Sequence, residues 1–87
     1  MEDLLKEYRK ELNDIDSEII ELLDERFNLC WEIGGYKKEN GIPVLDEKQE
    51  MKKYSQVEKA ASPDNADAVK AVFETIISES RKIQQKL

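Results

Sequence analysis

The 87-residue sequence contains no histidine and a single cysteine, Cys30. Without histidine the chain cannot form Ser-His-Asp or Cys-His nucleophilic systems, and one thiol is too few for a typical zinc site. The lone thiol suits a reducing compartment, and the sequence has neither an N-terminal signal region nor an apolar run of membrane length. We therefore expect a cytoplasmic protein with no metal and no cofactor, whose chemistry depends on arginine, lysine, carboxylates and amides.

Acidic residues outnumber basic ones, 20 to 14, and apolar residues are few. The formal net charge is −6 at pH 7, which argues against nucleic acid or an anionic membrane as a partner, because both require a basic face. Charged residues make up 39% of the chain and hydrophobic residues another 39%. A chain of this size and composition forms one domain, residues 1–87, with a thin core, and self-association is expected.

The longest regular pattern covers residues 4–36, where apolar residues recur at steps of three and four. This spacing predicts one amphipathic helix of about 33 residues, roughly 50 Å long, which Asn40 and Gly41 end. A helix of that length needs a partner for its apolar stripe. Gly34 and Gly35 each cost about 1 kcal/mol relative to alanine, which indicates a close approach of backbone or ligand, or a simple kink.

Two shorter helices are expected after it. Residues 46–49 have the form of a capping box, so Asp46 should cap a second helix, Glu47–Ala60, whose weak apolar face the long helix must support. A break follows at residues 61–65, with Ser62 or Asp64 as the N-cap of a third helix. Apolar residues then alternate at steps of four and three over residues 69–87. With no strand pattern, the predicted fold class is all-α, with one long and two shorter helices.

Polar side chains interrupt the inward stripes of the predicted helices. Arg26 stands between Leu22 and Leu29 on the first stripe, where a guanidinium costs several kcal/mol unless an anion meets it. That anion is either an internal carboxylate or a bound ligand. On the third stripe, Ser80 is either bonded back to the preceding helical turn or part of a site, and Gln84 lies one turn further on.

The candidate site residues lie at or beside the stripes of all three helices: Arg26, Lys37, Asp46, Glu50, Ser80 and Gln84. In this order and spacing they resemble the chorismate mutases of the all-α class, over nearly the whole chain. The matching segments are Tyr8-Arg9-Lys10-Glu11-Leu12, Ile15-Asp16, Leu22-Leu23-Asp24-Glu25-Arg26, residues 32–46 and Phe73-Glu74-x-Ile76-Ile77-x-x-Ser80. The resemblance implies that two chains intertwine their long helices into a homodimer with two shared active sites.

The resemblance also implies an isomerase that rearranges chorismate to prephenate in phenylalanine and tyrosine biosynthesis, the shikimate pathway. In such a site Arg9 and Arg26 would bind the substrate carboxylates, and Lys37 and Gln84 would donate to the ether oxygen. The implied catalytic residues are thus Arg9, Arg26, Lys37 and Gln84, and the further substrate contacts are Asp46, Glu50 and Ser80. Arg9 and Arg26 are 17 residues apart, about 25 Å along one helix, so Arg9 must reach the site from the partner chain.

One position departs from the family pattern. The family usually has an arginine directly before the glutamate of the second helix, where this chain has Gln49 before Glu50. The change removes a charge-assisted contact worth about 1.5–3 kcal/mol. Lys48 is adjacent but points about 100° away on a helix. Two alternatives stay open: an isochorismate-pyruvate lyase, because such lyases resemble these mutases and have a similar cationic pocket, and a binding or regulatory dimer whose catalysis has decayed, which Gln49 supports.

Overall fold

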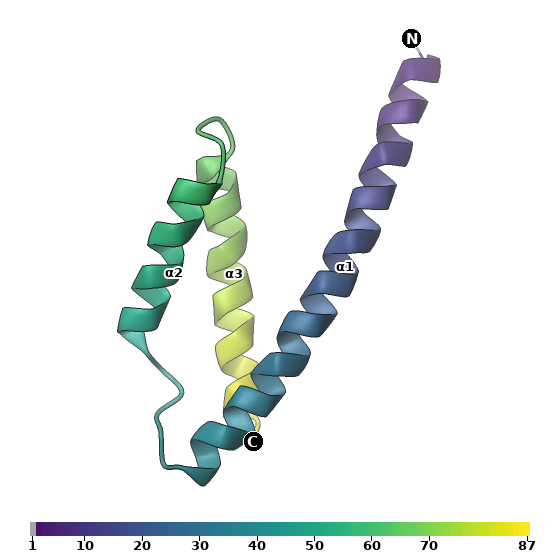
Figure 1. Ribbon diagram of the computed structural model, residues 1–87. Helices are drawn as coiled ribbons and strands as arrows, with labels where there is room; N and C mark the ends of the chain where they lie inside the picture. Colours follow the sequence, from purple (N-terminus) through teal and green to yellow (C-terminus); the bar gives the residue numbers. More distant parts are fainter. Residues whose placement is uncertain (1) are drawn as a thin grey trace.

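The computed structural model describes residues 2–87, with side chains from Asp3 onward, and this range forms three helices: α1 (Glu2–Glu39), α2 (Glu47–Ala60) and α3 (Ala66–Gln85). Figure 1 shows α2 and α3 as an antiparallel hairpin, with the end of α3 crossing the C-terminal part of α1. The rest of α1 projects away, and the molecule measures 58 × 24 × 15 Å. The predicted one long and two shorter helices are confirmed, and α1 extends slightly past residues 4–36.

Local capping sets the end of α1 and the start of α2. Past α1, Gly41 has a φ of 64°, and the Ile42 N–H donates to the Lys37 carbonyl at 2.8 Å, as in a glycine-terminated helix. At the start of α2, the Asp46 carboxylate accepts a hydrogen bond from the Gln49 amide at 3.1 Å. The predicted stop of the first helix and the predicted cap of the second are confirmed.

The start of α3 differs from the prediction. Its N-cap is Asn65, which makes no side-chain capping bond, so the expected cap at Ser62 or Asp64 is wrong. Instead the Asn65 N–H donates to the Ser62 carbonyl at 3.0 Å and closes a turn that contains Pro63, a residue whose fixed φ favours this position. The first helical bond then joins the Val69 N–H to the Asn65 carbonyl at 2.9 Å.

α3 lies at the centre of the chain. Within residues 2–87 it contacts both α1 and α2, which do not contact each other, so the expectation that the long helix supports α2 is wrong. The buried apolar residues in this range are Cys30, Val57 and Ile77, one from each helix. The core is thin, as predicted, and it lies where α3 meets its two neighbours.

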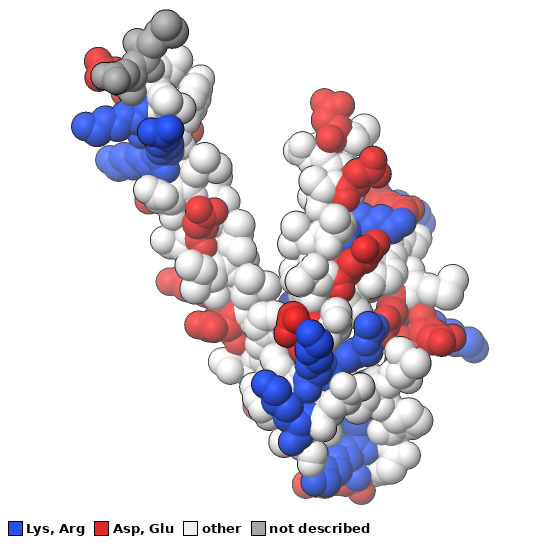
Figure 2. All heavy atoms as spheres, turned by 180° about the vertical axis from the view of Figure 1, so that it is seen from behind, with Lys and Arg blue, Asp and Glu red and all other residues white. Residues whose placement is uncertain are grey.

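The N-terminal half of α1 has no covering element within the chain. Every residue from Asp3 to Leu22 is exposed, including the apolar stripe residues such as Leu12, Ile15 and Ile19. Figure 2, the view from behind, shows this half standing apart from the other helices. None of the helices in residues 2–87 combines the length and apolar character needed to cross a bilayer.

The C-terminal half of α1 approaches α3 closely at one glycine. A Cβ atom added at Gly34 would lie 2.9 Å from the Cα of Gln84 and 2.8 Å from the Cδ1 of Leu87, whereas one at Gly35 would come no closer than 4.0 Å to Leu87. The close backbone approach predicted for the glycine pair is therefore confirmed at Gly34. This contact brings the last turn of α3 against α1.

Candidate active site

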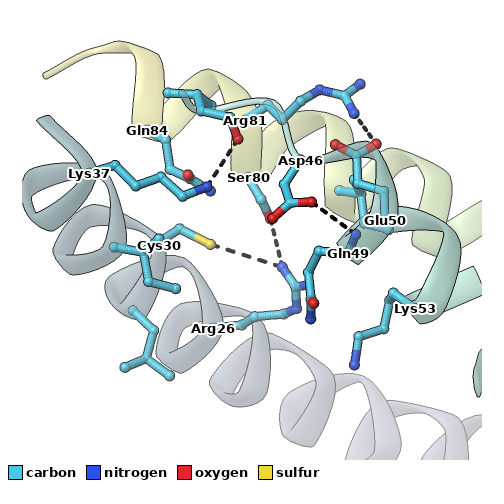
Figure 3. A pocket seen from close by; sticks show the side chains of 14 residues that line it. Arg26, Cys30, Lys37, Asp46, Gln49, Glu50, Lys53, Ser80, Arg81 and Gln84 are labelled. Carbon is cyan, nitrogen blue, oxygen red and sulfur yellow. Dashed lines mark hydrogen bonds and ion pairs between the residues drawn. The ribbon is translucent and has the colours of Figure 1, made fainter. Parts of the chain in front are cut away.

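A cavity of about 460 Å³ lies where the three helices converge (Figure 3). Its walls come from the C-terminal half of α1, the segment that leads into α2, the first turns of α2 and the second half of α3. Its lining residues are Arg26, Leu29, Cys30, Ile33, Lys37, Val44, Asp46, Gln49, Glu50, Lys53, Ile77, Ser80, Arg81 and Gln84. The cavity therefore contains every predicted site residue except Arg9.

Arg26 reaches the cavity from α1 and bonds to α3. Its guanidinium donates to the hydroxyl of Ser80 at 2.6 Å and lies 4.0 Å from the sulfur of Cys30. No carboxylate side chain of residues 3–87 lies within ion-pair distance of it, so the internal salt bridge considered for Arg26 is not formed among these residues. Its remaining donors are available to a bound anion.

The predicted bond of Ser80 to the preceding helical turn is confirmed, and its place in a binding site stays a prediction. Its side chain is buried, and the hydroxyl donates to the Ile76 carbonyl at 2.7 Å, the local bond common for serine in helices. The same oxygen accepts from Arg26 at 2.6 Å. Because the hydroxyl hydrogen is committed to Ile76, Ser80 offers Arg26 only lone pairs, and this fixes the direction of the guanidinium.

Gln84 leaves a polar atom unpaired beside the cavity. Within residues 2–87 its Oε1 is buried and has no hydrogen-bond partner. A buried amide group without a partner costs about 1–3 kcal/mol, so a polar ligand that bonds to it gains that energy back. A half-turn about the last side-chain bond exchanges the oxygen and the NH₂ group, so the amide can serve as acceptor or donor.

Lys37 and Asp46 stabilise the segment between α1 and α2. The ammonium of Lys37 donates to the Val44 carbonyl at 3.0 Å, and Asp46 caps α2 through the Gln49 amide. Both side chains line the cavity while they hold the connecting chain in place. Within residues 2–87 neither Lys37 nor Asp46 is in an ion pair.

Two cationic residues of the cavity, Arg81 and Lys53, were not among the residues predicted from the sequence. Arg81 bonds to Glu50 at 2.5 Å, and this hydrogen bond raises the pKa of Arg81 above its ordinary value. Lys53 follows Gln49 by one helical turn, a spacing that puts both on one face of α2. That spacing could have revealed Lys53, whereas Arg81 gave no signal because Glu50 is distant in sequence. Lys48, the neighbour considered earlier, is exposed and does not line the cavity.

Arg9 lies far from this cavity. It belongs to a shallow depression near the start of α1, together with Lys6, Lys10 and Asn13. The single chain does not bring Arg9 and Arg26 together, because one rigid helix holds them apart. Its contribution from a partner chain stays a prediction.

The charge of the cavity differs in sign from that of the whole chain. Four cationic side chains and two carboxylates line it, which leaves two net positive charges in a chain of net charge −6. Within residues 2–87 no group of three or more His, Cys, Asp or Glu side chains is arranged to hold a metal ion. The arrangement suits a small dianion that is bound by several hydrogen-bond donors.

The structure thus defines an all-α protein with a cavity whose lining carries two net positive charges. The family model of chorismate mutase type II matches residues 8–85, and the chain belongs to this family. A chorismate mutase from Methanocaldococcus jannaschii is 29% identical over 85 residues, which cover 94% of this chain and 85% of that protein. The predicted family is confirmed, and with it the predicted class of enzyme, a chorismate mutase and hence an isomerase.

A second relative contains the same region within a much longer protein. The bifunctional chorismate mutase/prephenate dehydratase of Buchnera aphidicola is 34% identical over 82 residues, which cover 92% of this chain and 21% of that protein. The similarity therefore concerns about a fifth of the Buchnera protein.

Proposed function

We propose that this chain rearranges chorismate to prephenate by binding the reactive conformer of the substrate and stabilising charge on its ether oxygen. The observation that supports this most directly is the cavity with two net positive charges, in which Arg26 has no carboxylate partner within residues 2–87. Prephenate is a precursor of phenylalanine and tyrosine, which is the pathway we assign to the enzyme. The unpaired thiol of Cys30 suits a cytoplasmic location.

The reaction requires that the site hold the substrate in its reactive conformer and stabilise the negative charge that develops on the ether oxygen. In this intramolecular rearrangement a C–O bond breaks as a C–C bond forms, without a nucleophile, and the substrate must first adopt a diaxial, chair-like conformer. Arg26, directed by Ser80, binds one substrate carboxylate through its planar guanidinium. Lys37 and Gln84 donate to the ether oxygen as negative charge develops there. The second oxygen of Glu50 accepts from the ring hydroxyl, and Asp46 makes a further polar contact.

A homodimer with shared active sites completes the proposal. The exposed apolar stripe in the first half of α1 would be covered by the same surface of a second chain, in an arrangement with twofold symmetry. An exposed stripe of this length is unusual for a stable monomer. Arg9 would then reach the partner's cavity and bind the second carboxylate.

Assays on two substrates and one mimic test the reaction. We expect formation of prephenate from chorismate, and no release of pyruvate from isochorismate, which would indicate the lyase. Calorimetry with a bicyclic dicarboxylate that mimics the transition state should show tighter binding of the mimic than of chorismate. Equal affinities would indicate the decayed binding dimer instead.

Removal of the Lys37 ammonium tests its assigned contact. Lys37→Ala should lower kcat/KM by about 10²- to 10³-fold, as loss of a preorganised donor does in other enzymes, with little change in helicity. Lys38→Ala is the matched control, because Lys38 is exposed and does not line the cavity. A decrease of less than tenfold for Lys37→Ala would contradict its role at the ether oxygen.

A further inference from the structure

Lys53 is a cavity cation with no assigned role. It is half-buried, and it lies on the same face of α2 as Asp46, Gln49 and Glu50, all of which line the cavity. Its ammonium donates to the neutral side-chain oxygen of Gln56 at 2.8 Å, and no carboxylate side chain of residues 3–87 forms an ion pair with it. Figure 3 shows the Lys53 side chain extending from α2 toward α1, next to Gln49.

The other three cations of the cavity already bond to groups on α2, on α3 or in the segment between α1 and α2. Arg81 is paired with Glu50 at 2.5 Å, whereas Arg26 and Lys37 bond to neutral oxygens from α3 and the connecting segment. Lys53 is therefore the cation through which α2 can bind an anion. A charge-assisted bond to a carboxylate is roughly twice as strong as a bond to a neutral amide oxygen, so a substrate carboxylate would displace Gln56 as the partner of Lys53.

We propose that Lys53, on α2, binds a carboxylate of the substrate, and that the side-chain NH₂ group of Gln49 donates a hydrogen bond to the same carboxylate. The inference rests on the proposed function, because it requires a dicarboxylate substrate. Four residues, about 6 Å of rise, separate Gln49 and Lys53 along α2, and the four-carbon stem of a lysine spans that distance. The ammonium of Lys53 thus supplies the charge that the neutral side chain of Gln49 lacks.

The test compares Lys53→Gln with Lys52→Gln, which removes the same charge from an exposed residue of the same helix that does not line the cavity. We expect Lys53→Gln to raise both KM for chorismate and Kd for the bicyclic dicarboxylate about 10- to 100-fold, the loss typical of a hydrogen bond between charged groups. Lys52→Gln should change KM and Kd by no more than about twofold. Circular dichroism verifies that both variants fold, and Lys53→Arg should retain most of the affinity.

Gln49→Arg provides a rescue experiment. A guanidinium at position 49 would meet the same carboxylate, so Gln49→Arg should restore at least half of the affinity lost in Lys53→Gln, and it should raise kcat/KM in the wild-type background. If Lys53→Gln matches Lys52→Gln, or if Gln49→Arg fails to rescue it, the role of Lys53 is wrong while wild-type turnover of chorismate upholds the proposed function. If the wild type neither converts chorismate nor binds the mimic, both proposals fail together.

Discussion

The two halves of α1 have the same apolar spacing and opposite surroundings. From Asp3 to Leu22 every residue is exposed, whereas in the second half Cys30 and Gly34 are buried against α3. One continuous helix thus passes from a half that no other element of residues 2–87 covers to a half that α3 covers on the side of Cys30 and Gly34, while the stripe residues Leu29, Ile33 and Tyr36 stay exposed there too. An apolar stripe in a sequence therefore predicts that a helix needs a packing partner, but it does not identify that partner.

The same difference separates the two arginines of the proposed site. Arg26, in the covered half, is held by Ser80 at 2.6 Å, while Arg9, in the open half, lies among charged residues of both signs, Asp3, Lys6, Glu7 and Lys10. A segment of helix without tertiary contacts is only marginally stable in water, so we expect the open half to depend on a second chain for its order. Four predictions test this contrast.

The largest effect is expected from the arginines themselves. Arg9→Ala and Arg26→Ala homodimers should each lose at least about 10²-fold in kcat/KM, because every site lacks one carboxylate contact. When the two variants are unfolded and refolded together, about half of the dimers should be mixed, each with one intact site, so activity should recover to roughly a quarter of wild type. Mass spectrometry verifies that mixed dimers form. Their formation without recovered activity would contradict the shared site.

A charge on the open stripe should weaken the dimer. Ile19 is 47% exposed in the single chain, and burial of that remaining surface against a second chain would contribute about 1 kcal/mol per chain. We expect Ile19→Glu to raise the dimer dissociation constant at least 10²-fold by sedimentation, because the carboxylate would also be desolvated. Ser17→Glu, on the opposite side of the helix, is the control, and it should leave the dimer dissociation constant nearly unchanged. A wild-type chain that sediments as a folded monomer at micromolar concentration would contradict the dimer.

An intermediate effect is expected where the covered half meets α3. A methyl group at Gly34 would lie 2.9 Å from the Cα of Gln84, so Gly34→Ala should lower the free energy of unfolding by about 1–3 kcal/mol and also lower activity by displacing Gln84. Gly35→Ala is the matched control. Its methyl group has room, so it should raise stability by up to about 1 kcal/mol through helix propensity. If Gly34→Ala and Gly35→Ala change the free energy of unfolding in urea equally, the close approach at Gly34 is unimportant for stability.

The smallest effects compare two serines with the same local bond. Ser17 donates to the Asn13 carbonyl at 3.1 Å in the open half of α1, and Ser80 donates to the Ile76 carbonyl at 2.7 Å beneath Arg26. Ser17→Ala should change the free energy of unfolding by no more than about 0.5 kcal/mol. Ser80→Ala should lower it by about 1 kcal/mol and reduce kcat/KM several-fold, because Arg26 loses its acceptor. Indistinguishable kinetics of the two variants would contradict the positioning of Arg26 by Ser80.

The sequence by itself determined the elements and most of the cavity. The three- and four-residue steps predicted the long helix, Gly41 predicted its end, and the Asp46 cap predicted α2 at its observed bounds. Arg26 and Ser80 were found because each breaks an apolar stripe. These signals are local, since periodicity and caps depend on residues within about one helical turn of each other.

Only the tertiary structure decided which surfaces meet. It joined Arg81 to Glu50, made α3 rather than α1 the support of α2, and distinguished Gly34 from Gly35 by their distances to the last turn of α3. Each of these depends on how two helices cross, and that crossing is set by side-chain packing over the whole contact. An apolar stripe indicates a face that needs to be covered, and the packing of the helices decides which side is covered: α3 covers α1 on the side of Cys30 and Gly34, beside the stripe.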